Sequence, residues 1–129
     1  MKKLLTIPTL IFSIVSSSIS FAGWTKVAEN VNGTYYVDFG RIRKHGDYIK
    51  FRELIDLLEP NKNGELSYKL YQEGDCKLFR YKYLSSSNYK QPMGEGHRVD
   101  YNEPDKDWRY PSPYSINEIV LKSVCDYVK

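Results

Sequence analysis

Two cysteines constrain this chain more than any other feature of its sequence. Cys76 lies in mid-sequence and Cys125 lies close to the C-terminal end, and both follow an N-terminal segment that looks like a secretory leader. An even number of cysteines after a leader indicates an oxidising compartment and a disulfide. The alternative is a free nucleophilic thiol, for which no activating histidine is evident nearby in the sequence. We therefore expect a Cys76–Cys125 bridge that ties two distant parts of the chain together.

The first residues have the three parts of a signal peptide. Lys2 and Lys3 form the positive start, residues 4–15 are apolar, and Ser20 and Ala22 occupy positions −3 and −1 of a cleavage site after Ala22. The apolar stretch of about 12 residues is shorter than the roughly 20 that a spanning helix needs. An uncleaved membrane anchor is the alternative. No cysteine stands near the cleavage site, so the sequence gives no support for a lipid anchor.

This leader divides the chain into a signal peptide, 1–22, and one small domain, 23–129. We expect export through the inner membrane to the periplasm, or further to the cell surface or the medium, without stable membrane insertion. A domain of this size buries only a modest core, so a single cross-link matters. In the chain-entropy model the Cys76–Cys125 loop contributes roughly 4 kcal/mol.

The charge of the domain is nearly balanced. Loss of Lys2 and Lys3 with the leader lowers the formal net charge from +3 to +1. Nucleic-acid-binding domains carry a strong basic excess, so we expect no nucleic-acid partner.

Most of the domain is predicted to be β-structure. Alternating polar and apolar residues, separated by turn signals such as Asn32-Gly33, favour a meander of strands. We place a break at Gly74-Asp75, so that Cys76 starts the fifth strand, and we expect residues 39–44 to be a connection and 102–113 to be irregular. The predicted strands cover residues 24–29, 34–38, 48–56, 66–72, 76–85 and 97–101.

The last element is predicted to be a helix. Ser115 and Glu118 fit a capping box. In this motif the Ser115 side chain accepts from the backbone amide of Glu118, and the Glu118 side chain accepts from the backbone amide of Ser115. Apolar residues then recur at helical spacing and form one broad stripe that includes Cys125. Strands followed by one helix indicate an α+β domain, an antiparallel sheet of about six strands with the C-terminal helix packed on one face.

The ordered set of short motifs resembles the surface-adhesin protein E-like family of proteobacterial exported proteins. No motif is specific alone, but their order covers nearly the whole domain. The motifs are Trp24, Tyr35-Tyr36-Val37-Asp38 before Arg41-Ile42-Arg43, Asp75-Cys76, Met93-Gly94-Glu95-Gly96, and Trp108 before Pro-x-Pro and a helix that contains Cys125.

The resemblance implies a six-stranded antiparallel sheet whose C-terminal helix is held by a disulfide between cysteines that match Cys76 and Cys125. The founding member looks like an adhesin that binds host matrix and plasma proteins and can dimerise. The resemblance therefore implies a protein partner, either from the host or from the envelope, and a possible homodimer. The alternative is a periplasmic accessory or inhibitor protein with no adhesive role, which the missing lipid-anchor cysteine favours.

The sequence gives no argument for an enzyme or for a bound cofactor or metal. His45 and His97 are far apart and both stand near turns, whereas a metal site needs clustered ligands. No Gly-x-Ser-x-Gly elbow is present. We expect a non-enzymatic binding protein.

Two sets of residues are candidates for partner contact. Arg41, Arg43 and Lys44 form the densest basic run, suited to sulfated glycans or acidic protein patches, although such runs are commonly solvated turns. Strand aromatics interleaved with Arg52, Arg80 and Lys82 would form a second contact surface, with core filling as the alternative for most of them. These aromatics are Tyr35, Tyr36, Tyr68, Tyr71, Phe79, Tyr81, Tyr83 and Tyr89.

Overall fold

A computed structural model describes residues 20–21 and 23–129. The predicted signal peptide lies outside the described residues, apart from the backbone of Ser20 and Phe21. No helix in the described part of the chain is long and apolar enough to cross a membrane. The elements are β1 (Ser20–Phe21), β2 (Trp24–Glu29), β3 (Gly33–Val37), η1 (Phe39–Arg41), β4 (Arg43–His45), β5 (Tyr48–Leu57), β6 (Ser67–Asp75), β7 (Arg80–Gln91), η2 (Pro92–Gly94), β8 (Glu95–Tyr101) and α1 (Ile116–Tyr127).

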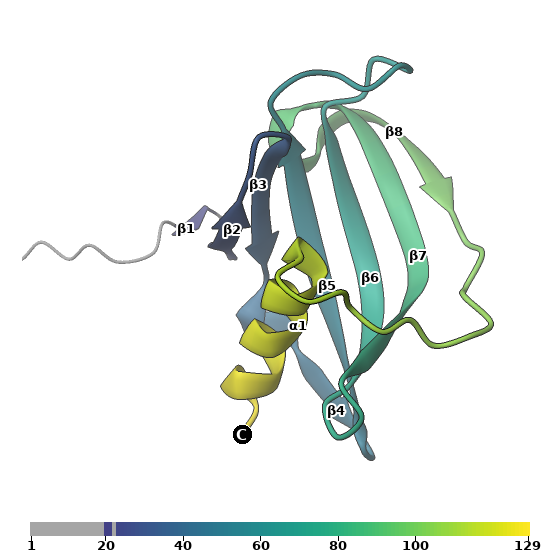
Figure 1. The fold of residues 1–129 in the computed structure, drawn as a ribbon. Coiled ribbons are helices and arrows are strands. Elements are labelled where there is room, and N and C mark those ends of the chain that lie inside the picture. The colour runs from purple at the N-terminus through teal and green to yellow at the C-terminus, as the bar shows by residue number, and fades with distance from the viewer. Residues whose placement is uncertain (1–19, 22) are drawn as a thin grey trace, which may run out of the picture.

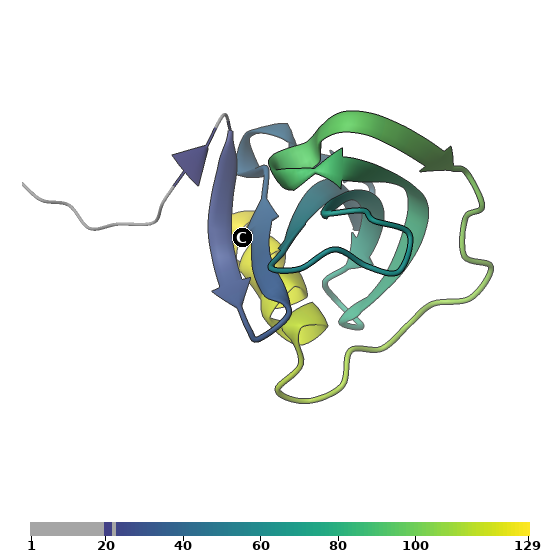
Figure 2. The same cartoon turned by 90° about the horizontal axis from the view of Figure 1, so that it is seen from above.

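The strands form one curved antiparallel sheet, and α1 packs across one of its faces (Figures 1 and 2). The strand order is β1-β2-β3-β5-β6-β7-β8, and the short β4 pairs with the start of β5. Six of these strands have five or more residues and match the six that the sequence predicts. The α+β fold class is therefore confirmed.

The predicted break at Gly74-Asp75 is wrong, because β6 continues through Asp75 and the turn comes after it. The Asp75 carboxylate accepts hydrogen bonds from the amides of Lys77 (3.1 Å) and Leu78 (3.2 Å), so this side chain starts the turn rather than ending a loop. Phe79 closes the turn with a φ of +53°. Cys76 consequently lies in the turn, not at the start of a strand.

The main core lies between the sheet and α1. Ile49 and Phe51 alternate toward the helix, and Leu121 packs above them. Gly74 lies directly under this contact, where a Cβ would come 3.1 Å from Leu121 Cδ1. The helix thus approaches the sheet closely because β6 has no side chain at this position. The buried members of this core are Val37, Ile49, Phe51, Tyr81, Val120, Leu121, Val124 and Cys125.

The helix start is capped by the predicted residues, with one difference. Ser115 Oγ accepts the amide hydrogen of Glu118 (3.1 Å), as expected for an N-cap. The Glu118 carboxylate, however, accepts from the amide of Tyr114 (2.8 Å), one residue before the cap. Tyr114 has a φ of +63°, which turns its amide toward Glu118 and takes the place of the reciprocal bond.

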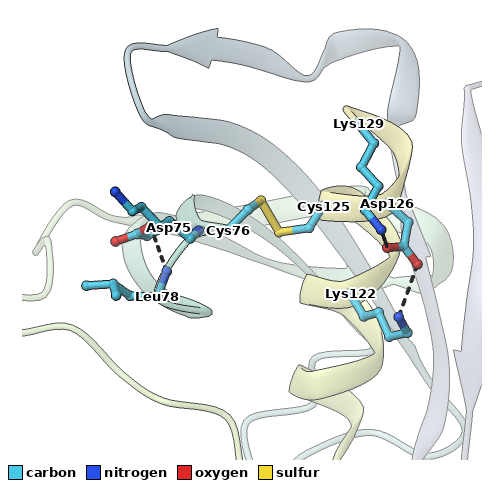
Figure 3. Close-up of a disulfide and its surroundings, with 8 residues drawn as sticks. Asp75, Cys76, Leu78, Lys122, Cys125, Asp126 and Lys129 are labelled. Atoms are coloured by element: carbon cyan, nitrogen blue, oxygen red, sulfur yellow. Dashed lines mark hydrogen bonds and ion pairs between the residues drawn. A yellow bond between two sulfur atoms is a disulfide. The ribbon is translucent and has the colours of Figure 1, made fainter.

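The Cys76–Cys125 disulfide forms as predicted, with 5.6 Å between the two Cα atoms. It joins the turn between β6 and β7 to the last turns of α1 (Figure 3). Asp126 beside it pairs with Lys122 (3.3 Å) and Lys129 (3.4 Å). The bridge clamps the end of the helix to the sheet, while the apolar core holds the middle.

Replacing Cys76 and Cys125 together by serine should lower the free energy of unfolding by about 4 kcal/mol, because the unfolded chain loses a closed loop. Urea unfolding followed by circular dichroism measures this difference. A buried-core control, Val124→Ala, keeps the disulfide, so it should be less stable than wild type and lose further stability in reductant, whereas the double-serine protein should not respond to reductant. Equal stability of the oxidised and double-serine proteins would contradict the clamp.

Candidate binding face of the sheet

The helix covers only one face of the sheet, and strand alternation sends a different set of side chains to the other. We call the opposite side the helix-free face. It is occupied mainly by polar, cationic and aromatic residues, in contrast to the apolar helix side. Its central members on β5, β6 and β7 are Lys50, Arg52, Leu54, Lys69, Tyr71, Glu73, Lys82, Ser85 and Ser87.

The strand register arranges these side chains in rows across the sheet. Arg52 stands opposite Tyr71, which in turn stands opposite Ser85. The guanidinium of Arg52 lies over the Tyr71 ring, 4.5 Å from its centroid. Such a cation–π contact stabilises by about 0.5–1 kcal/mol at an exposed site and restricts the long arginine side chain. The cation is therefore held in place above the sheet.

Trp108 adds a second aromatic ring to the helix-free face, beside the first residues of β7. The segment after β8 runs beside β7 and is fixed by paired backbone hydrogen bonds between Tyr81 and Arg109, of 2.8 and 2.9 Å. This places the Trp108 ring 4.4 Å from the Arg80 guanidinium and 4.7 Å from the Lys82 ammonium. An indole and two cations, distant in sequence, thus form one cluster.

Asp105 holds this segment in position. Its carboxylate accepts the amide of Tyr83 (2.9 Å) and receives two bonds from Arg109, of 2.6 and 2.9 Å. The hydrogen bond from Arg109 and that from the Tyr83 amide outweigh burial and lower the pKa of Asp105. Residues 102–113 were predicted to be irregular and contain no regular strand. The hydrogen bonds of Asp105 and Arg109 nevertheless hold this segment against β7.

Arg80 is the cation of this face that has a buried partner. Arg80 Nε lies 2.8 Å from Asp75 Oδ2. Burial raises the pKa of the Asp75 carboxyl, but the hydrogen bonds from Arg80 and from the backbone amides of Leu78 and Lys77 more than offset it, and the net pKa is lowered. Asp75 therefore stays ionised and fixes Arg80 against Trp108.

The other cations of these rows have no carboxylate within ion-pair distance among the described residues. The carboxylates on the same face are fewer than its cations, and they are Asp56, Glu73, Asp75 and Asp100. The excess of cationic over acidic side chains on the helix-free face is larger than the net charge of +1 expected for the whole domain after loss of the leader. The remaining surface must be acidic on balance, so the positive potential is concentrated on one face. These cations are Arg43, Lys50, Arg52, Lys69 and Lys82.

The predicted basic run Arg41, Arg43 and Lys44 is divided by the structure. Arg41 ends η1 and its Nε lies 3.5 Å from Asp38 Oδ2. Arg43 stands opposite Lys50 and adds to the helix-free face, whereas Lys44 stands opposite Ile49, whose side chain belongs to the helix-side core. Their role as partner contacts stays a prediction.

The structure brings together part of the second predicted set, the strand aromatics interleaved with Arg52, Arg80 and Lys82. Arg52, Arg80 and Lys82 do meet aromatic rings on the helix-free face, as described above. Tyr81, by contrast, is buried in the helix-side core, with Phe79 and Tyr83 packed against it. Strand alternation would also have found Lys69 beside Tyr71. Trp108 could not be found this way, because its partners are far away in sequence.

The helix-side face holds one unusual titrating group, Glu53. Its side chain is 1% exposed and accepts a hydrogen bond from Gln72 Nε2 (2.6 Å). Burial raises the pKa of Glu53 to about 7, and the bond from Gln72 offsets only part of this. Burial likewise raises the pKa of neighbouring Tyr81 and Tyr83. Because Glu53 is closed off, it is not placed to act on a ligand.

Among residues 23–129, no group of three histidine, cysteine or carboxylate side chains is arranged to hold a metal ion. His45 lies at the end of β4 and His97 on the edge strand β8, and both are exposed. What the arrangement offers chemically is a rigid, positively charged surface.

Comparison with known proteins identifies the family and supports the fold. The family model for surface-adhesin protein E matches residues 24–126. One crystal form of Haemophilus influenzae protein E is 18% identical, with a TM-score of 0.67 over 92% of this chain and 100% of that one. A selenomethionine form is 16% identical, with a TM-score of 0.64 over 88% and 93%. At these identities the likeness shows the fold. A search of curated proteins finds no match.

Glu53→Gln should stabilise the protein at alkaline pH. Since the folded-state pKa of Glu53 is raised to about 7 from 4.5, the wild type loses stability as the pH rises through this window, by about 3 kcal/mol in all. The variant keeps an acceptor for Gln72 and avoids this loss. Urea unfolding at pH 5 and pH 8 measures it. Glu59→Gln, an exposed control, should behave like wild type. A wild-type-to-variant difference that is independent of pH would refute the assignment.

Proposed function

Because the chain belongs to the surface-adhesin protein E family, we propose that it is an exported, non-enzymatic domain that binds a protein partner through its helix-free face. The observation that carries this proposal is the concentration of cations without carboxylate partners beside aromatic rings on that face. Arginine and aromatic residues are the types enriched at protein interfaces. The partner is a host matrix or plasma protein, or a protein of the bacterial envelope.

The charge pattern supports an acidic partner surface. Arg43, Lys50 and Lys82 lie in one row across β4 to β7, with Glu73 of β6 as the one acidic residue between Lys50 and Lys82. Such a row steers an oppositely charged partner and raises its association rate in a salt-dependent way. Arg80 and Trp108, held by Asp75, supply a rigid aromatic anchor beside the row.

The alternative is a periplasmic accessory or inhibitor protein. The Cys76–Cys125 disulfide is compatible with this location, because the periplasm is an oxidising compartment. Protease treatment of intact cells separates the two: digestion supports surface display, and protection supports the periplasm. Either location is compatible with binding through the helix-free face.

Reversing the charge of Lys50 and Lys82 should weaken partner binding at least tenfold, because each lost charge-assisted contact removes about 1.5 kcal/mol or more. Binding is measured by biolayer interferometry against purified matrix and plasma proteins and against fractionated envelope proteins. Lys62, in the loop between β5 and β6, and Lys122, on α1, are both exposed and provide the charge-matched control when both are changed to glutamate. Wild type that binds none of these proteins, or equal binding by the two double variants, would sink the proposal.

A further inference from the structure

A cleft of about 290 Å³ opens on the helix-free face between β6, β7 and β8. Three cations, Arg52, Lys69 and Arg98, line it together with the hydroxyl-bearing Ser85 and Ser87. The cations come from three different strands, whereas both serines come from β7. The curvature of the sheet, visible in Figure 2, turns this part of the face into a concave site rather than a flat patch.

Lys69 is held in a defined position. Its ammonium lies over the Tyr89 ring, 5.1 Å from the centroid, and its chain passes close to Gly94. A Cβ at Gly94 would collide with Lys69, and the φ of +71° at this position also favours glycine. The Gly94 amide donates to Ser67 Oγ (2.8 Å), which fixes the η2 turn on this face. Lys69 therefore loses little freedom when it binds a ligand.

The wall of the cleft formed by β7 and β8 is also held by contacts between its side chains. Ser87 Oγ donates to Asp100 Oδ1 (2.6 Å), and Arg98 Nε lies 3.3 Å from the same oxygen. Asp100 thus holds Arg98 beside Ser87. Arg52, stacked on Tyr71, stands on the far side of Ser85. The cleft presents cationic donors from several directions, with hydroxyls between them.

Two classes of anionic ligand fit this site poorly. Single-stranded nucleic acid binds by stacking bases on open aromatic faces, but cations lie over the rings of Tyr71, Tyr89 and Trp108. Membrane surfaces are bound by apolar side chains that insert into the lipid. The exposed large apolar residues of the described chain lie in loops, on β8 or in α1, and none is on the helix-free positions of β5, β6 or β7.

We infer that the cleft binds a sulfate group of a sulfated polysaccharide. A tetrahedral sulfate offers oxygens in several directions and so can meet Arg52 and Lys69 at once, while Ser85 and Ser87 can bond sugar hydroxyls. Lys50 and Lys82 lie outside the cleft on the same face, where they can contact further sulfate groups of the same polysaccharide chain. The inference goes beyond the proposed function, since it assigns a polysaccharide ligand to the same face in addition to a protein partner.

Fluorescence anisotropy of a labelled heparin oligosaccharide, with the full chain purified in its disulfide-bonded form, tests this assignment. The competitors are the desulfated oligosaccharide, polyglutamate and single-stranded DNA. Arg52→Gln and Lys69→Gln should each weaken binding about tenfold, and Ser85→Val should weaken it without any change of charge. Lys62→Gln, in the loop between β5 and β6, and Lys122→Gln, on α1, remove the same charge elsewhere and should leave the affinity unchanged.

Preferential binding of the sulfated oligosaccharide, lost in the cleft variants alone, supports the inference. Equal competition by polyglutamate or DNA, or equal weakening by the Lys62 and Lys122 variants, would overturn it, because binding would then follow charge without a site. Variants that lose oligosaccharide binding must retain the wild-type urea midpoint. Capture of a protein partner without any oligosaccharide binding overturns this inference alone and leaves the proposed function standing.

Discussion

The packing of α1 on one face of the sheet is the constraint on which the rest of the molecule depends. The disulfide between Cys76 and Cys125 and the contact of Leu121 over Gly74 keep the helix on that side. Because side chains alternate along a strand, the apolar residues that meet the helix force their neighbours to the opposite side. The helix thereby determines which surface carries the charges.

The sequence was sufficient to predict elements whose signals are local. The strand that covers residues 48–56, the cap at Ser115 and the pairing of two cysteines all followed from neighbouring residues or from a count. The turn after Asp75 was misplaced because its two side-chain-to-backbone bonds, and not the glycine before it, decide where the strand ends. Glycine at position 74 serves helix packing instead.

The candidate site was only partly predictable, for a similar reason. Arg52 and Lys82 could be assigned to the helix-free face from alternation, but their aromatic partners depend on strand register and on the path of the segment after β8. Trp108 reaches Arg80 only because Asp105 and Arg109 fix that segment along β7. Adjacent basic residues such as Arg43 and Lys44 looked like one cluster, yet the same alternation separates them.

The central claim is that partners bind the helix-free face. Amide chemical-shift mapping by NMR tests this claim most directly. A protein partner or the sulfated oligosaccharide is titrated into the isotope-labelled protein. The account predicts that the perturbed amides cluster on β5, β6 and β7 around Arg52, Lys69 and Ser85, with α1 unaffected. Perturbations confined to α1 or to the loop between β5 and β6 would contradict it.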